Sequence, residues 1–427
     1  MTSEVLILNK RGAVLAADSA VTTSGGDQGH PRYSKSANKI FELTQNGSIA
    51  AAIYGNAQID SVPWELAIKL FRKQFGDSSH QQVKQYADSL MAYLSGNDRL
   101  FPEPLRLQWI ESQFDKALQT LVADAQRSNP SIFDESVPLD ERRAHWAVEQ
   151  ARLESLLDGM DMPSSLSQPP LDQLLSHIGS WATRAKEQID QVSTLAAVDP
   201  VSLAQLGHKL RYKMPDWILS GTGLVIVGYG EEAIFPASRQ LEVFGHVGDE
   251  IYVKTVRDFE VTHLGPALIQ PLAQTSMIDM FTDGFGQSLE LIIRAESRSA
   301  FANLFSALSD AGVSVPPELV ESITDSCQLD FMNKWKLENW RKNFHPLIEV
   351  LQSLSVQEIG HLAESLLGLE SLKERVTSPS ESVGGPIDVA VITKSEGLVW
   401  IKRKHYFDPA LNIRYAARLD RSLKEDN

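Results

Sequence analysis

Residues 2–18, TSEVLILNKRGAVLAAD, contain two short apolar runs separated by a turn. The runs cover residues 5–8 and 13–17, and Gly12 between them can adopt the positive φ that a tight turn requires. Continuous apolar runs of this length are typical of strands that are buried on both faces. We therefore predict a core hairpin at the start of the chain, where terminal residues would normally fray.

Thr2, at the start of this hairpin, is a candidate nucleophile. A small second residue favours removal of Met1, which would leave Thr2 with a free α-amine that titrates near pH ~8. Such an amine can serve as the general base for the hydroxyl group of its own residue. Many chains begin Met-Thr, so Thr2 alone does not decide the function.

The spacing of several further motifs resembles that of proteasome β-type subunits and their bacterial relative HslV. Thr2, Gly12 and the run Ala16-Ala17-Asp18 match the start of the mature chains in that family. Residues 36–40, SANKI, resemble the segment with the active-site lysine. Residues 49–55, IAAAIYG, resemble the next strand and its oxyanion-hole glycine, and residues 384–402 resemble a Gly-Gly turn and the last hairpin.

This resemblance implies an α+β fold, the four-layer αββα sandwich of N-terminal nucleophile (Ntn) hydrolases, in which helices flank two stacked antiparallel sheets. It covers residues 2–75, 221–265 and 356–404, and the remaining segments read as helical insertions. The expected organisation is a first part of the core at 1–76, a helical insertion at 77–218, a second part of the core at 219–300, a second insertion at 301–354, a final helix and hairpin at 355–404, and a C-terminal arm at 405–427.

The resemblance also assigns roles at the site. Thr2 would attack an amide carbonyl, and Lys39 would lower the pKa of the Thr2 amine. Asp18 would hold Lys39 charged, and the Gly55 N–H would stabilise the oxyanion. The substrate-binding positions of the family fall on small or apolar residues: Val21, Ala37, Ile53 and Ala57.

The sequence departs from the family at the Gly-Gly turn of residues 384–385. The family usually has Ser before this turn, whereas this chain has Val383. Ser382 is the nearby candidate to support the amine of Thr2 instead. A second supporting Ser of the family would fall near 264–266, where this chain has none.

Hydrophobic periodicity and turn residues predict the other elements. Ser61 is expected to cap a helix that buries Trp64 and Phe71, and Ser355 and Glu358 form a capping box before another helix. Asn46-Gly47 predicts a hairpin turn. The remaining helices are expected at 81–94, 107–127, 139–157, 171–195, 201–213 and 266–294, and the strands at 39–43, 49–54, 221–230, 241–247, 250–256, 387–393 and 398–402.

Composition narrows the function classes. The chain has 427 residues, a net charge of −15 and a single cysteine, Cys327. The acidic balance disfavours nucleic acid and anionic membranes as partners, and one cysteine excludes an internal disulfide framework. We expect a cytoplasmic protein, because no signal peptide and no apolar run of ~20 residues are present. No metal motif is evident, and no cofactor is expected.

Three functions remain open from the sequence. The first is a proteasome-like threonine hydrolase that cleaves peptide bonds as a homo-oligomer, with room for an unfoldase partner. The second is an Ntn amidohydrolase of a small amide, which helical insertions closing the cleft would favour. The third is a catalytically silent relative that acts as a scaffold or binding protein, which retention of Met1 would favour.

Overall fold

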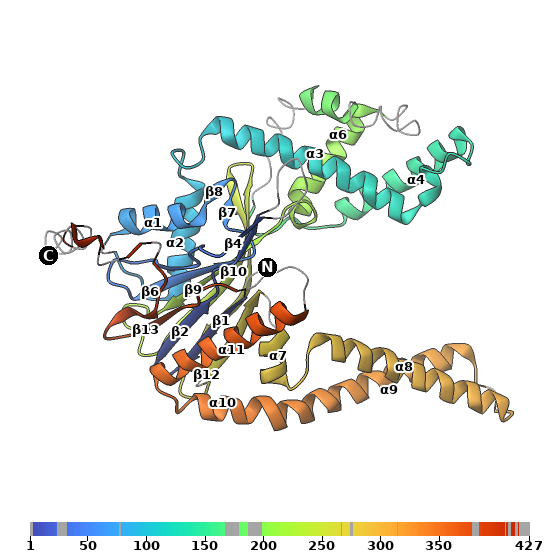
Figure 1. The fold of residues 1–427 in the computed structure, drawn as a ribbon. Coiled ribbons are helices and arrows are strands. Elements are labelled where there is room, and N and C mark those ends of the chain that lie inside the picture. Colours follow the sequence, from blue (N-terminus) through green and yellow to red (C-terminus); the bar gives the residue numbers. More distant parts are fainter. Residues whose placement is uncertain are drawn as a thin grey trace.

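The computed structural model describes residues 3–23, 32–76, 78–166, 179–186, 199–265, 267–273, 276–313, 315–377, 384–405, 407–408, 411–414 and 417. Within these residues, two five-stranded antiparallel sheets form the centre of the molecule (Figure 1). A mixed helix and strand protein with antiparallel sheets was expected, and this much is confirmed.

The predicted N-terminal hairpin lies inside the first sheet. Its strand order is β12-β1-β2-β13-β14. Asn9 fixes the turn, because its side-chain oxygen accepts the N–H of Arg11 at 2.8 Å and the N–H of Gly12 at 3.3 Å. The strands are β1 (Ser3–Asn9), β2 (Gly12–Ala17), β12 (Ala267–Ala273), β13 (Asp388–Thr393) and β14 (Gly397–Lys402).

The second sheet has the order β11-β10-β9-β6-β5. The predicted Asn46-Gly47 turn joins two of its strands, and Gly47 has a φ of +66°. The strands are β5 (Ile40–Glu42), β6 (Ile49–Tyr54), β9 (Thr222–Gly228), β10 (Ala237–Val247) and β11 (Glu250–Glu260). Two small ribbons accompany the sheets, β3 (Val21–Thr23) with β4 (Arg32–Ser34) and β7 (Gln58–Ile59) with β8 (Val62–Pro63).

Alternating side chains of β1 divide the core into two parts. Leu6 and Leu8 pack against residues of the second sheet, whereas Val5 and Ile7 pack against helix α11 (Val356–Thr377). On the far side of the second sheet, α1 (Trp64–Phe75) and α2 (Val83–Ser95) cover another apolar cluster, which includes the buried Trp64. The central strands of both sheets are therefore buried on both faces, as the continuous apolar runs indicate.

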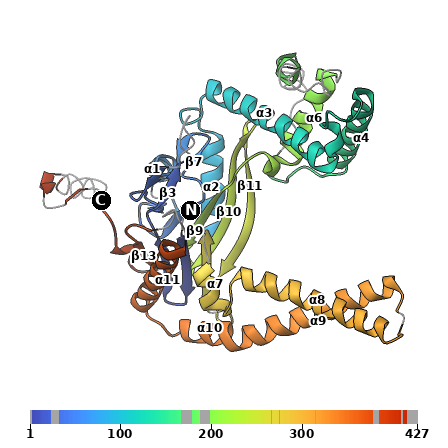
Figure 2. The same ribbon diagram turned by 45° about the vertical axis from the view of Figure 1, so that its right-hand side comes forward.

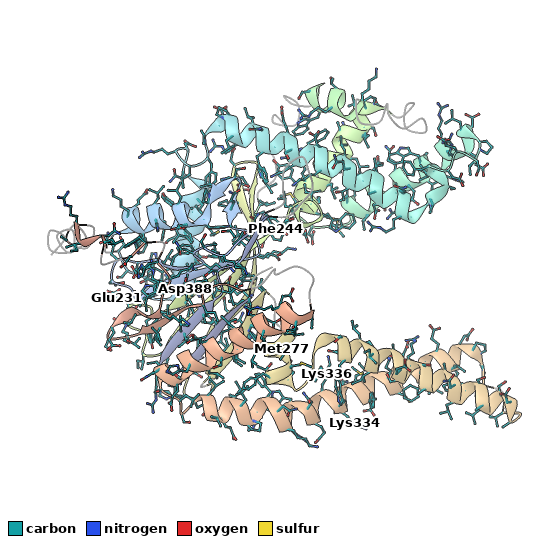
Figure 3. All side chains as sticks on the ribbon, viewed as in Figure 1. Glu231, Phe244, Met277, Lys334, Lys336 and Asp388 are labelled. Atoms are coloured by element: carbon teal, nitrogen blue, oxygen red, sulfur yellow. The ribbon has the colours of Figure 1, made fainter. Side chains whose placement is uncertain are left out.

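The first helical arm leaves the core between α2 and β9. It has its own apolar core, to which Phe244 contributes from the end of β10 (Figure 3). Its elements are α3 (Glu103–Ser128), η1 (Pro130–Ile132), α4 (Leu139–Asp158), α6 (Pro200–Lys213) and η2 (Pro215–Trp217). These confirm the helices predicted at 107–127, 139–157 and 201–213. Of the helix predicted at 171–195, residues 179–186 are described and are helical.

The second helical arm follows strand β12. The prediction of a single long helix at 266–294 is wrong, because this segment contains β12, α7 (Ser276–Asp283) and the start of α8 (Gln287–Asp310). Residues 267–273 form β12 at the edge of the first sheet, where Pro271 is tolerated because an edge strand leaves one row of backbone groups unpaired. The helices follow: α7, α8, α9 (Pro317–Asn339), η3 (Trp340–Phe344) and α10 (His345–Leu351). Helices α8 and α9 project side by side away from the core (Figure 2).

Two predicted helix starts had different outcomes. The capping box is confirmed, because the Ser355 N–H and hydroxyl group each donate to Glu358 at 2.8 Å. Ser61 does not cap α1, which begins after Pro63. Instead Ser61 lies in the tight turn between β7 and β8, where its φ is +70°. A residue in this turn is too early in the chain to cap α1, which starts at Trp64.

Candidate functional site

Three segments that are distant in the sequence meet at one end of the two sheets. Asp18 follows β2, Lys39 precedes β5, and Gly384 lies shortly before β13. The strand pairing explains why they meet, because β13 lies beside β2 and places Asp388 opposite Ala17. This end of the sheets is called the site end below.

Asp18 is the centre of the hydrogen bonding at the site end. Its Oδ1 accepts a bond from Lys39 Nζ at 2.5 Å and from the Ser3 N–H at 3.1 Å. Its Oδ2 accepts the N–H of Gly384 at 2.8 Å. Asp18 and Lys39 are 1% and 3% exposed, so this is a buried ion pair. Three donors from separate segments compensate the buried carboxylate, as buried charges require.

Backbone hydrogen bonds hold Lys39 and the neighbouring loops in place. The Ile53 N–H donates to the Lys39 carbonyl at 3.0 Å, and the Ala37 N–H donates to the Ser19 carbonyl at 3.2 Å. The Ser19 hydroxyl donates to the carbonyl of Pro386 at 2.5 Å. The ammonium group of Lys39 is therefore fixed from both the first and the second sheet.

Gly55 follows β6, two residues after the bond from Ile53 to Lys39. It is exposed and has a φ of +84°. Glycine adopts this conformation without the steric cost that a Cβ atom imposes. The residue expected to form the oxyanion hole thus lies next to the segment that holds Lys39, in a backbone conformation that favours glycine.

The four expected substrate-binding residues differ in their surroundings. Val21 and Ala37 are half-buried near the loops of the site end, and Ala57 is exposed. Ile53 is 4% exposed and packs in the cluster beneath α1 and α2. The position of Ile53 is that of a core residue.

Two of the assigned site residues, Thr2 and Ser382, lie outside the described residues. Thr2 is bonded directly to Ser3, whose N–H and carbonyl both bond to Asp18. The residue that precedes Ser3 is therefore attached to the backbone unit that Asp18 holds.

Glu4 is the residue of the site end that the motif analysis missed. It is 1% exposed, and its Oε1 lies 3.9 Å from Lys39 Nζ. Neither of its carboxyl oxygens has a hydrogen-bond partner among the described residues. Burial raises the pKa of Glu4 to about 8, although Lys39 acts to lower it and Asp18 raises it further. The available signal was a single acid in β1, directly before the apolar run at 5–8 and on the same face as Leu6 and Leu8.

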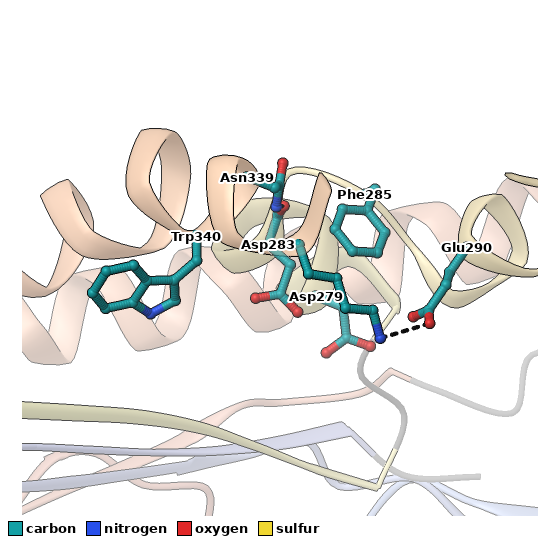
Figure 4. A pocket seen from close by; sticks show the side chains of 7 residues that line it. Asp279, Asp283, Phe285, Glu290, Asn339 and Trp340 are labelled. Atoms are coloured by element: carbon teal, nitrogen blue, oxygen red, sulfur yellow. Dashed lines mark hydrogen bonds and ion pairs between the residues drawn. The ribbon is translucent and has the colours of Figure 1, made fainter. Parts of the chain in front are cut away.

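A separate pocket of about 400 Å³ lies at the base of the second arm (Figure 4). It is lined by acidic side chains of α7 and α8 and by Trp340, and Lys336 pairs with Glu290 at 2.7 Å. Across the part of the chain that the structure describes, no three His, Cys, Asp or Glu side chains gather closely enough to hold a metal ion.

No protein-family model and no curated protein matches this chain. Among the described helices, none combines the length and the apolar composition needed to cross a bilayer.

Proposed function

We propose that this protein is an amide-bond hydrolase of the N-terminal nucleophile class, with peptides as its substrates and Thr2 as its nucleophile. The observation that carries the proposal is the buried Asp18–Lys39 pair, at 2.5 Å, bonded to the backbone of Ser3. The ion pair therefore bonds the backbone unit to which Thr2 is covalently attached.

The layering supports the same proposal. The apolar cluster between the two sheets contains Leu6, Leu15 and Val225, and separate clusters lie beneath α11 and beneath α1 and α2. This is the order of layers in an αββα sandwich, with the start of β1 at one end. We propose that the fold is the Ntn hydrolase sandwich with two inserted helical arms.

The proposed reaction is acyl transfer to the Thr2 hydroxyl group. The free α-amine of Thr2, after Met1 is removed, takes the hydroxyl proton as Oγ attacks the amide carbonyl. The ammonium of Lys39 favours the neutral form of this amine, and Asp18 keeps Lys39 in place. The proton then passes to the leaving amine, and water hydrolyses the ester to regenerate Thr2.

The Gly55 N–H is the proposed donor to the oxyanion of the tetrahedral intermediate. A single donor of this kind is typically worth about 3–4 kcal/mol of transition-state stabilisation. Its place in the chain supports the role, because Gly55 follows the strand that bonds the backbone of Lys39. The attacking group and the oxyanion donor would then be held by adjacent segments.

The test is the intact mass of the purified protein, with and without a peptide epoxyketone. This reagent reacts with both the hydroxyl group and the free amine of an N-terminal threonine. Loss of Met1 and a single adduct that is absent from Thr2→Ala would support the proposal. Retained Met1 without an adduct would contradict it and favour a scaffold. Loss of Met1 without an adduct would contradict peptide cleavage and direct the search to small amides.

A further inference from the structure

Glu4 lies in the space between the two sheets. Side chains of a strand alternate between its faces, so Glu4 shares a face with Leu6 and Leu8, which belong to the inter-sheet cluster. The carboxyl group is buried and receives no hydrogen bond among the described residues. A buried acid without a donor is costly when ionised, so it calls for an explanation in terms of the site.

The ionisable groups around Glu4 come from different strands. Lys39 lies 3.9 Å away in the segment before β5, and Asp18 follows β2. Tyr54 at the end of β6 also interacts electrostatically with Glu4, and its hydroxyl group accepts a bond from Gln240 at 2.5 Å. Leu272, which pairs with Glu4 from β12, carries no ionisable group. Among the described residues, Lys39 is thus the cation that faces both carboxyl groups, and its Nζ lies much closer to Asp18 than to Glu4.

We propose that Glu4 is a positioning residue that acts through Lys39, and that its carboxyl group switches the site between a neutral state and a negatively charged state. In the neutral state Glu4 carries its proton, and Lys39 is balanced by Asp18 alone. When Glu4 releases its proton to solvent, Lys39 lies between two carboxylates. This inference rests on the proposed function, because the switch acts on the amine of Thr2.

The two states have opposite effects on the nucleophile. A neutral Lys39–Asp18 pair leaves the positive end of the pair to favour the uncharged, basic form of the amine. An additional negative charge on Glu4 favours the protonated amine, which cannot accept the hydroxyl proton. The neutral state is therefore the active one, and activity should fall as Glu4 ionises.

The experiment measures the rate of epoxyketone adduct formation against pH for the full-length protein and for Glu4→Gln. Because the pKa of Glu4 is about 8, the two rates should agree at about pH 6, where Glu4 is protonated. At about pH 9 roughly nine tenths of Glu4 is ionised, so Glu4→Gln should react about tenfold faster than the wild type. A residue with only a structural role would change the rate by one factor at every pH.

Two further variants sharpen the result. Glu4→Met is a second uncharged variant and should reproduce the profile of Glu4→Gln, which covers the case in which one of them folds poorly. Glu42→Gln removes a carboxylate on β5 that pairs with Arg72 near the surface, and its profile should match the wild type.

The outcomes separate the two proposals. A wild-type rate that falls above about pH 8 while both uncharged variants stay high supports the switch. Equal profiles for the wild type and Glu4→Gln, or a wild-type rate that keeps rising, overturn the switch and leave the proposed function standing. A wild type that forms no adduct at any pH overturns the proposed function and the switch together.

Discussion

Asp18 Oδ1 and Lys39 Nζ lie 2.5 Å apart in the interior, although 21 positions separate the two residues in the chain. The same carboxylate also bonds Gly384, 366 positions further along. One side chain thus connects the first strand, the segment before β5 and the turn before β13. The charge balance at this point should govern both the stability and the activity of the protein.

Lys39→Met should remove activity while leaving a folded protein. The substitution leaves Asp18 buried without its cation, which costs about 3–5 kcal/mol. The free energy of unfolding of a typical protein is ~5–15 kcal/mol, so the variant should remain folded. Urea denaturation would measure the loss of stability, and epoxyketone labelling the loss of the adduct.

Lys69→Met is the matched control. Lys69 forms an exposed pair with Glu65, and such pairs contribute about 0.5 kcal/mol or less. A Lys39→Met protein that still forms the adduct at the wild-type rate would contradict the role of Lys39.

Glu4 should make the free energy of unfolding depend on pH. Burial raises the pKa of Glu4 from 4.5 to about 8, so the folded protein keeps a proton that the unfolded chain releases. The contribution of protonated Glu4 to the free energy of unfolding is complete below pH 4.5 and is lost as the pH rises to about 8. The loss amounts to up to roughly 5 kcal/mol for a shift of this size.

The comparison is the difference in unfolding free energy between the wild type and Glu4→Gln, measured across that pH range. The wild type should lose stability relative to Glu4→Gln as the pH rises, because the amide does not ionise. A constant difference would show that Glu4 is ionised in the folded protein throughout.

Gly55→Ala should lower both stability and activity. Gly55 has a φ of +84°, and a Cβ atom there would meet the Gly221 carbonyl at 3.6 Å, which is an ordinary contact. The cost is therefore conformational, about 1–2 kcal/mol. The rate of adduct formation should fall by more than this stability cost explains, because relief of the strain shifts the Gly55 N–H away from the oxyanion. Gly76→Ala, at a φ of +59° with open space around it, should cost similar stability but no activity.

Asp60→Ala should loosen the junction between the core and the first arm. Asp60 Oδ2 accepts the His246 N–H at 2.8 Å and lies 2.6 Å from His246 Nδ1, and the His246 carbonyl accepts a bond from Gln113 of α3 at 2.5 Å. Loss of these buried bonds should cost about 2–4 kcal/mol. Backbone hydrogen exchange should become faster in α3. Asp249 is exposed, so the control variant Asp249→Ala should change neither the free energy of unfolding nor the exchange in α3.

Local sequence patterns predicted the elements whose turns and apolar faces are encoded nearby. The hairpin around Gly12 and the turn at Asn46-Gly47 are of this kind, because a few adjacent residues determine each. The strand β12 could not be found in this way. Its short apolar run includes Pro271, and it is a strand because it pairs along the whole of β1, which is far away in the sequence.

The candidate site was predictable to a similar extent. Motif spacing indicated Asp18 and Lys39, and the structure brings them together, while their catalytic roles remain predictions. The contribution of Gly384 depends on the pairing of β13 with β2, which no local pattern records. Glu4 could have been noticed as a single acid in an apolar strand, but its distance from Lys39 required the fold.

The bond from Gly384 to Asp18 also sets an order of events during synthesis. Strand β2 lies between β1 and β13, and β13 is made last of the three. At about 5–20 residues per second, the ribosome needs roughly 20–70 seconds to add the 366 residues that separate Asp18 from Gly384. During that time the apolar edge of β2 lacks its neighbour, which is a hazard for aggregation. The nascent chain therefore carries an unfinished site until β13 has been made, and products of translation interrupted before β13 would be inactive.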